Sequence, residues 1–77
     1  MSRQAIEESV RASLEKYLSD LDGEPATNVY EMMMRTVEKP LLEVVMRHTA
    51  NNQSQAAAIL GINRNTLRKK LGDHGLL

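Results

Sequence analysis

Apolar residues recur every three or four positions along the first 21 residues, a spacing that lines one face of an α-helix. The stripe consists of Ile6, Val10, Leu14, Tyr17, Leu18 and Leu21. Ser2 is a candidate N-cap, and residues 22–25 (DGEP) end the helix because glycine favours a left-handed backbone and proline disfavours helix at the residue before it. The pattern predicts a first helix from Ser2 to Leu21.

A second and more apolar pattern begins near Thr27 or Asn28, either of which can cap a helix, and extends to His48 and Thr49. Its main stripe is Tyr30, Met33, Met34, Val37, Leu41, Val45 and His48, and further apolar residues flank it. Pro40 lacks a backbone donor, but the stripe continues in phase across it, which favours a bent helix over a broken one. So broad an apolar surface predicts a helix covered on more than one side, with its methionines in a core or dimer contact.

Residues 49–52 (TANN) predict a turn, and two short helices follow it. Asn52 can cap the first, Gln53–Leu60, and Asn63 can cap the second, Arg64–Leu71, which ends at the glycines that follow it, Gly72 and Gly75. The sequence therefore predicts four helices and an all-α fold.

The two short helices have the pattern of a helix-turn-helix. Small residues, Ala56 and Ala57, permit close crossing, Gly61 makes the turn, and a buried seam follows, made of Leu60, Ile62, Leu67 and Leu71. The exposed side of the second helix is polar and basic: Arg64, Asn65, Thr66, Arg68, Lys69 and Lys70. Such a helix fits the DNA major groove, where arginine pairs with guanine, asparagine with adenine, and other cations with phosphates. The plainer alternative is a solvated basic face on an all-α domain.

The charge distribution supports a nucleic-acid partner even though the net charge is zero. Residues 1–50 hold six basic and nine acidic groups, net −3, whereas residues 51–77 hold four basic and one acidic, net +3. The 77 residues include no cysteine, phenylalanine or tryptophan. A single core of this size supplies only about 3 to 5 kcal/mol, so a partner chain is expected to complete it.

Other classes of function are disfavoured. His48 and His74 lie far apart without cysteines or spaced carboxylates, so no metal site or cofactor is expected. His48 is expected to pack or to cap its helix, His74 to be exposed, and Glu38 to be an ordinary solvated carboxylate. No nucleophile, base and orienting group occur together, so neither an enzyme nor a small-molecule substrate is expected. No run is apolar enough to span a membrane and no export signal is apparent, which favours the cytoplasm.

Residues 61–71 (GINRNTLRKKL), preceded by residues 37–46 (VEKPLLEVVM), resemble the Fis family of bacterial nucleoid-associated proteins, the factors for inversion stimulation. The resemblance implies a homodimer whose long helices intertwine and whose helix-turn-helix motifs read adjacent major grooves of bent double-stranded DNA. It also implies DNA contacts at Asn52, Ser54, Asn63, Arg64, Thr66, Arg68, Lys69 and Lys70, with Arg64 reading bases.

Two departures from the family pattern are visible. Longer members carry an N-terminal β-hairpin arm that activates site-specific recombinases. This chain begins at the first helix, so we expect a short form without the arm and without recombination enhancement. Basic residues of other members are matched here by neutral or acidic ones, Ala50, Gln55, Gly72 and Asp73, so fewer contacts to flanking phosphates are expected.

The sequence thus predicts one Fis-like domain, residues 1–77, with two long dimerisation helices in residues 1–50 and the helix-turn-helix in residues 51–77. The expected role is sequence-tolerant DNA binding and bending in nucleoid organisation and transcription regulation, with RNA polymerase as a candidate partner. Two alternatives remain. One is the C-terminal domain of a sigma-54-dependent activator, against which the complete first helix argues; the other is a helical dimerisation adaptor that binds no DNA.

Overall fold

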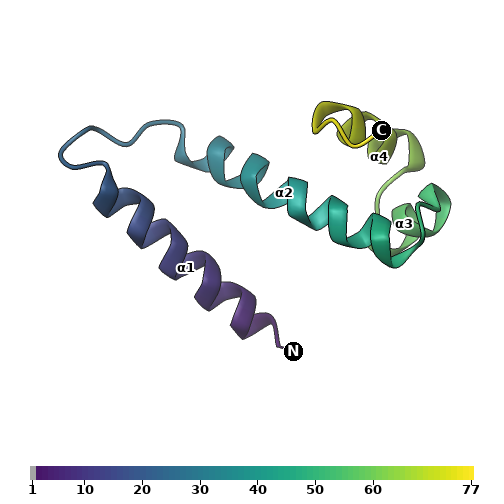
Figure 1. The fold of residues 1–77 in the computed structure, drawn as a ribbon, viewed down its shortest axis with the longest axis horizontal. Coiled ribbons are helices and arrows are strands. Elements are labelled where there is room, and N and C mark those ends of the chain that lie inside the picture. The colour runs from purple at the N-terminus through teal and green to yellow at the C-terminus, as the bar shows by residue number, and fades with distance from the viewer. Residues whose placement is uncertain (1) are drawn as a thin grey trace.

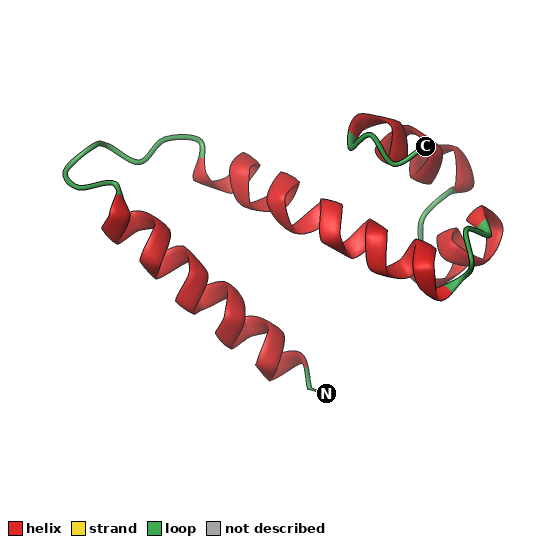
Figure 2. Cartoon of the chain, viewed as in Figure 1, coloured by secondary structure: helices red, strands yellow, loops and turns green. Residues whose placement is uncertain are grey.

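A computed structural model describes residues 2–77 as four helices joined by loops (Figures 1 and 2). These are α1 (Arg3–Asp20), α2 (Val29–His48), α3 (Gln53–Leu60) and α4 (Arg64–Asp73). No strand occurs among the described residues, and the predicted all-α fold is confirmed. Helix α2 runs unbroken through Pro40, as the in-phase apolar stripe predicted.

The hydrophobic core lies at one end of the molecule, where α3 packs against both α2 and α4. Its buried members are Leu42 and Met46 of α2, Ala56 and Ala57 of α3, and Leu67 and Leu71 of α4; Val45, Leu60, Ile62 and Leu76 pack around them. The two alanines let the helices approach closely, as predicted. The helix-turn-helix is therefore docked on the C-terminal half of α2.

The other half of the molecule has no such core. Helix α1 buries none of its residues, and its N-terminal part diverges from α2 (Figure 1). The chain measures 44 × 28 × 17 Å and has a radius of gyration of 14.9 Å, whereas a compact chain of this length has about 11.5 Å. The apolar faces of α1 and the first half of α2 are thus left largely uncovered by the chain itself.

Three helices end with the same hydrogen-bonding pattern, in which an amide donates to the carbonyl five residues earlier. These bonds join Asn51 N to Met46 O (2.8 Å), Ile62 N to Ala57 O (3.1 Å) and Leu76 N to Leu71 O (2.7 Å). The residue before each donor has a left-handed backbone: Ala50 (φ 51°), Gly61 (φ 71°) and Gly75 (φ 69°). Gly61 and Gly75 end their helices as predicted. The prediction that Gly72 also ends α4 is wrong, because α4 continues to Asp73.

Asparagine side chains cap the two short helices. The Oδ1 atom of Asn52 accepts a hydrogen bond from the Gln55 amide at 3.0 Å, and that of Asn63 accepts one from the Asn65 amide at 2.7 Å. Both predicted caps are confirmed. At the starts of α1 and α2, Ser2 and Asn28 occupy the capping positions, but their side chains make no capping bond.

Candidate nucleic-acid interface

Helix α4 has one buried face and one solvent-exposed polar face. Leu67 and Leu71 are fully buried against α2 and α3. The side chains predicted to face DNA lie on the outside: Arg64, Asn65, Thr66, Arg68 and Lys69 are all exposed. The packing of the two leucines fixes which side of α4 faces solvent, and this side is the one that carries the cations.

The first turns of α3 and α4 add uncharged hydrogen-bonding groups. Asn52, Ser54 and Asn63 are exposed at these two helix starts. In both asparagines the cap uses the side-chain oxygen, which leaves the amide NH₂ as a free donor. Donors at a helix N-terminus favour an anionic partner, because the free backbone amides and the helix dipole both place partial positive charge there.

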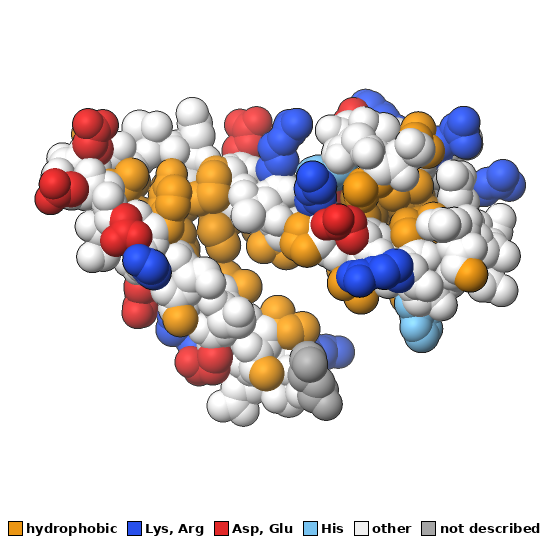
Figure 3. All heavy atoms as spheres, in the orientation of Figure 1, with side chains coloured by type: hydrophobic (Ala, Val, Ile, Leu, Met, Phe, Trp, Pro, Cys, Tyr) orange, Lys and Arg blue, Asp and Glu red, His pale blue; other side chains and the backbone are white. Residues whose placement is uncertain are grey.

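The charge separation along the sequence is also a separation in space. In the space-filling view, Lys and Arg side chains project from the end formed by α3 and α4, whereas α1 and the loop after it carry many of the acidic groups (Figure 3). Within residues 2–77, Arg64, Arg68 and Lys69 form no ion pair. Three cations of each chain are thus available to an anionic ligand.

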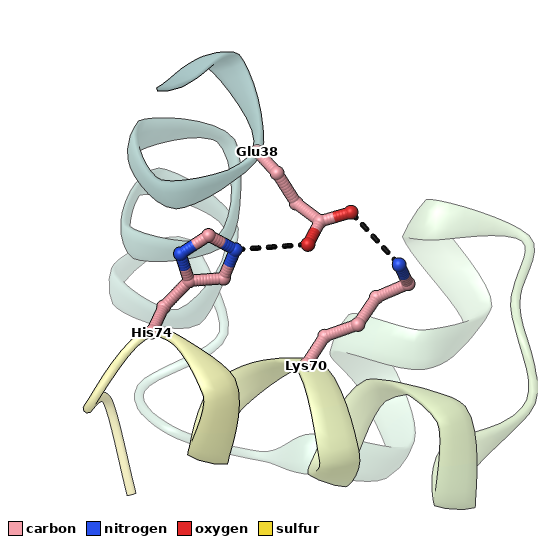
Figure 4. Close-up of polar contacts among 3 residues, drawn as sticks. All are labelled: Glu38, Lys70 and His74. Carbon is pink, nitrogen blue, oxygen red and sulfur yellow. Dashed lines mark hydrogen bonds and ion pairs between the residues drawn. The ribbon is translucent and has the colours of Figure 1, made fainter. Parts of the chain in front are cut away.

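Lys70 differs from these three, because its side chain turns back toward α2. Its Nζ lies 2.8 Å from Oε2 of Glu38, and Nε2 of His74 lies 2.9 Å from Oε1 of the same carboxylate (Figure 4). The hydrogen bond from Lys70, followed by that from His74, holds the pKa of Glu38 below its ordinary value. Lys70 is thus the one predicted DNA contact that the structure places apart from the exposed face.

This cluster corrects two expectations: Glu38 is half-buried and paired, not solvated, and the His74 side chain is only 7% exposed. A third correction lies elsewhere, because His48, which was expected to pack or to cap its helix, is exposed. The spacing of Lys70 and His74, four residues apart, does place both on one face of a helix. Nothing in the spacing indicates which residue of α2 this face meets, so the sequence alone could not have identified Glu38.

No group of three or more His, Cys, Asp or Glu side chains within residues 2–77 is arranged to hold a metal ion. Among the same residues, no helix is both long and apolar enough to cross a membrane.

A groove of about 370 Å³ lies between α1 and α2 and is lined mainly by apolar side chains, among them Val10, Tyr17, Met33 and Val37.

Comparisons with known proteins agree with this architecture. The family described as "Bacterial regulatory protein, Fis family" matches residues 33–74. A Fis-like DNA-binding protein of Ralstonia nicotianae is 61% identical over 77 residues, which is the full length of both chains. DNA-binding protein Fis of Actinobacillus succinogenes is 46% identical over 76 residues, covering 99% of this chain and 77% of the relative. The corresponding protein of Vibrio cholerae is 45% identical, with 99% and 78% covered. The chain belongs to the Fis family of bacterial regulatory proteins.

Proposed function

We propose that this protein binds double-stranded DNA by placing the exposed face of α4 in the major groove. The observation that carries the proposal is the composition of this face: three unpaired cations together with asparagine and threonine, opposite a buried leucine seam. The major groove admits one α-helix, and its base edges present the acceptors and donors that such side chains recognise. Three relatives are named as DNA-binding proteins, which supports the same conclusion.

The proposed roles of the side chains follow from their positions on the helices. Arg64 lies in the first turn of α4, the part of a recognition helix that contacts base edges, and its guanidinium matches guanine O6 and N7. Asn65 and Thr66 lie beside it, while Arg68 and Lys69 lie further along the helix and suit phosphates. The polar groups at the two helix starts, Asn52, Ser54 and Asn63, suit phosphates on either side of the groove.

We further propose a homodimer in which residues 1–50 form the dimerisation core and residues 51–77 the DNA-binding region. The support is the large apolar surface that one chain leaves exposed on α1 and α2: Ile6, Val10, Tyr17, Leu18, Tyr30, Met34, Val37, Leu41 and Val44. Soluble monomers rarely expose so extensive an apolar surface. The elongated shape of the chain and the groove between α1 and α2 support the same proposal, because a second copy could cover these surfaces.

A dimer of this kind presents two copies of α4 to one DNA duplex. Bending DNA by 40 to 90 degrees costs about 1 to 6 kcal/mol, which additional protein contacts offset. We propose that the protein is a DNA-binding protein and not an enzyme. It bends DNA in the bacterial cytoplasm and contributes to nucleoid organisation and transcription regulation. RNA polymerase is the candidate protein partner of such a regulator.

Replacing two cations of α4 separately tests this division of roles. Arg64→Ala should weaken binding to a selected high-affinity site by about 1 to 3 kcal/mol and binding to random duplex less, because a base contact is lost. Lys69→Ala should weaken both about equally, because phosphates occur in every sequence. Fluorescence anisotropy with labelled duplexes at fixed salt measures all four affinities.

A matched control removes a cation from α1, far from the helix-turn-helix. Lys16→Ala should leave DNA affinity unchanged, since Lys16 pairs with Asp20 on an exposed face of α1. Equal specificity ratios for Arg64→Ala and Lys69→Ala would contradict the assigned roles. Absence of binding by the unaltered protein at moderate salt would instead favour a dimerisation adaptor.

A further inference from the structure

One ionic cluster joins the dimerisation and DNA-binding parts of the chain. Among residues 2–77, the other ion pairs, Arg11–Glu8 and Lys16–Asp20, lie within α1. The cluster instead connects Glu38 of α2 to Lys70 of α4 and to His74, the residue that follows α4, and each of these donates to a different oxygen of the carboxylate. Figure 4 shows Lys70, from α4, and His74, at the end of that helix, both extending toward Glu38 on α2.

The two donors that contact Glu38 favour its ionised form. The two hydrogen bonds occupy one donor of Lys70 and one nitrogen of His74, and the His74 ring is almost fully enclosed. A hollow of about 320 Å³ lies beside the cluster. Its lining includes Glu31, Arg35 and Asp73. Lys70 is the only Lys or Arg among the described residues of α4 that has a carboxylate partner.

A carboxylate paired with a lysine competes with a DNA phosphate for that lysine. Both anions accept the same charge-assisted hydrogen bond. While Lys70 is paired with Glu38, the charges of the two groups cancel, and the exposed face of α4 presents three cations in place of four.

We propose that Glu38 is a positioning residue of the DNA interface: it holds Lys70 on α2 and thereby withholds one phosphate contact per chain. This inference rests on the proposed DNA-binding function and extends it. Phosphate contacts carry no sequence information, so their number sets the sequence-independent affinity and its dependence on salt. Glu38 therefore lowers the affinity of the protein for DNA of any sequence.

The test is the salt dependence of binding to a random-sequence duplex. In Glu38→Gln the side chain keeps its shape and one acceptor oxygen but loses its charge, which releases Lys70. The slope of log affinity against log salt should become steeper by about 0.9 for each chain on the duplex. For two chains, the affinity advantage of the variant should shrink roughly tenfold between about 50 and 200 mM salt.

Lys70→Gln, made both alone and together with Glu38→Gln, distinguishes release of the lysine from a general disturbance of α4. With Glu38 present, Lys70→Gln should leave the slope unchanged; with Gln at position 38, it should return the slope to that of the unaltered protein. Lys69→Gln is the matched control and should make the slope shallower in both backgrounds. Circular dichroism checks that each variant is folded.

Two results would overturn the inference while leaving the proposed function intact. One is an equally shallower slope for Lys70→Gln in both backgrounds, which would mean that Lys70 reaches phosphate despite Glu38. The other is a folded Glu38→Gln variant with an unchanged slope. If neither the unaltered protein nor Lys69→Gln showed salt-dependent binding, the proposed function would fail and this inference with it.

Discussion

Glu38 acquires its properties from residues 32 and 36 positions further along the chain. Helical periodicity identifies which residues share a face of α2, but it does not specify which segment packs on that face. Asn52 and Asn63 are different, because a cap contacts an amide two or three residues away and is visible in the local sequence. The caps were therefore predictable, whereas the cluster around Glu38 was not.

Acid should weaken the contribution of Glu38 to stability. Its pKa is lowered in the folded protein from the ordinary value of 4.5, mainly by the hydrogen bond from Lys70. A lowered pKa means that the ionised carboxylate stabilises the fold above the unfolded-state pKa, and that this stabilisation is lost as the pH falls through the folded-state value.

We expect Glu38→Gln to reduce the free energy of unfolding by about 0.5 to 1 kcal/mol near pH 7, the range of partly exposed ion pairs. The difference should vanish at acid pH, because both proteins then carry a neutral group at this position. Urea unfolding at fixed protein concentration measures both values. A difference independent of pH would mean that the charge of Glu38 is not the stabilising feature.

At the scale of elements, most helix boundaries follow from local chemistry. Gly61 and Gly75 adopt the left-handed backbone that ends α3 and α4, as their residue type predicts. Ala50 adopts it as well, although alanine disfavours it. Gly72 lies inside α4, which extends to Asp73, and the left-handed residue after this helix is Gly75. Residue type thus indicates where a helix can end, while packing determines which candidate is used.

Ala50→Gly should stabilise the protein by about 0.5 kcal/mol, because relief of the left-handed strain exceeds the added entropy of the unfolded chain. Gly61→Ala is the converse change and should cost about 1 kcal/mol. No atom lies within 4 Å of a Cβ built at Gly61, so the expected cost is that of the backbone alone. Thermal unfolding at one protein concentration should shift by a few degrees in opposite directions; shifts of the same sign would contradict this account.

At the scale of the whole molecule, α2 has two apolar surfaces with different roles. Leu42 and Met46 face the helix-turn-helix and are buried within the chain. Met34, Val37, Leu41 and Val44 remain exposed. The broad apolar pattern of the sequence predicted that α2 is covered on more than one side. The pattern did not distinguish the face of α2 that is buried within the chain from the face that we assign to a second copy.

Leu41→Asp tests that assignment, because Leu41 is 48% exposed in the single chain and is not needed for the helix-turn-helix core. A charge buried in a dimer contact should weaken self-association by about 100-fold or more. Sedimentation of the unaltered protein should report a dimer, and Leu41→Asp should lose it. Ile59→Asp is the control, since Ile59 is 56% exposed on α3, outside the proposed interface. A dimeric Leu41→Asp protein would contradict the proposed interface.

If two copies of α4 read one duplex, hydroxyl-radical footprinting at physiological ionic strength should detect both of them. A dimer should protect two stretches of backbone whose centres lie about 10 base pairs apart, in successive major grooves on one face of the DNA. At a protein concentration near the Kd of the unaltered protein, Arg64→Ala should weaken both stretches together. A single protected stretch, or protection that Arg64→Ala leaves unchanged at that concentration, would contradict the proposal that two copies of α4 read one duplex.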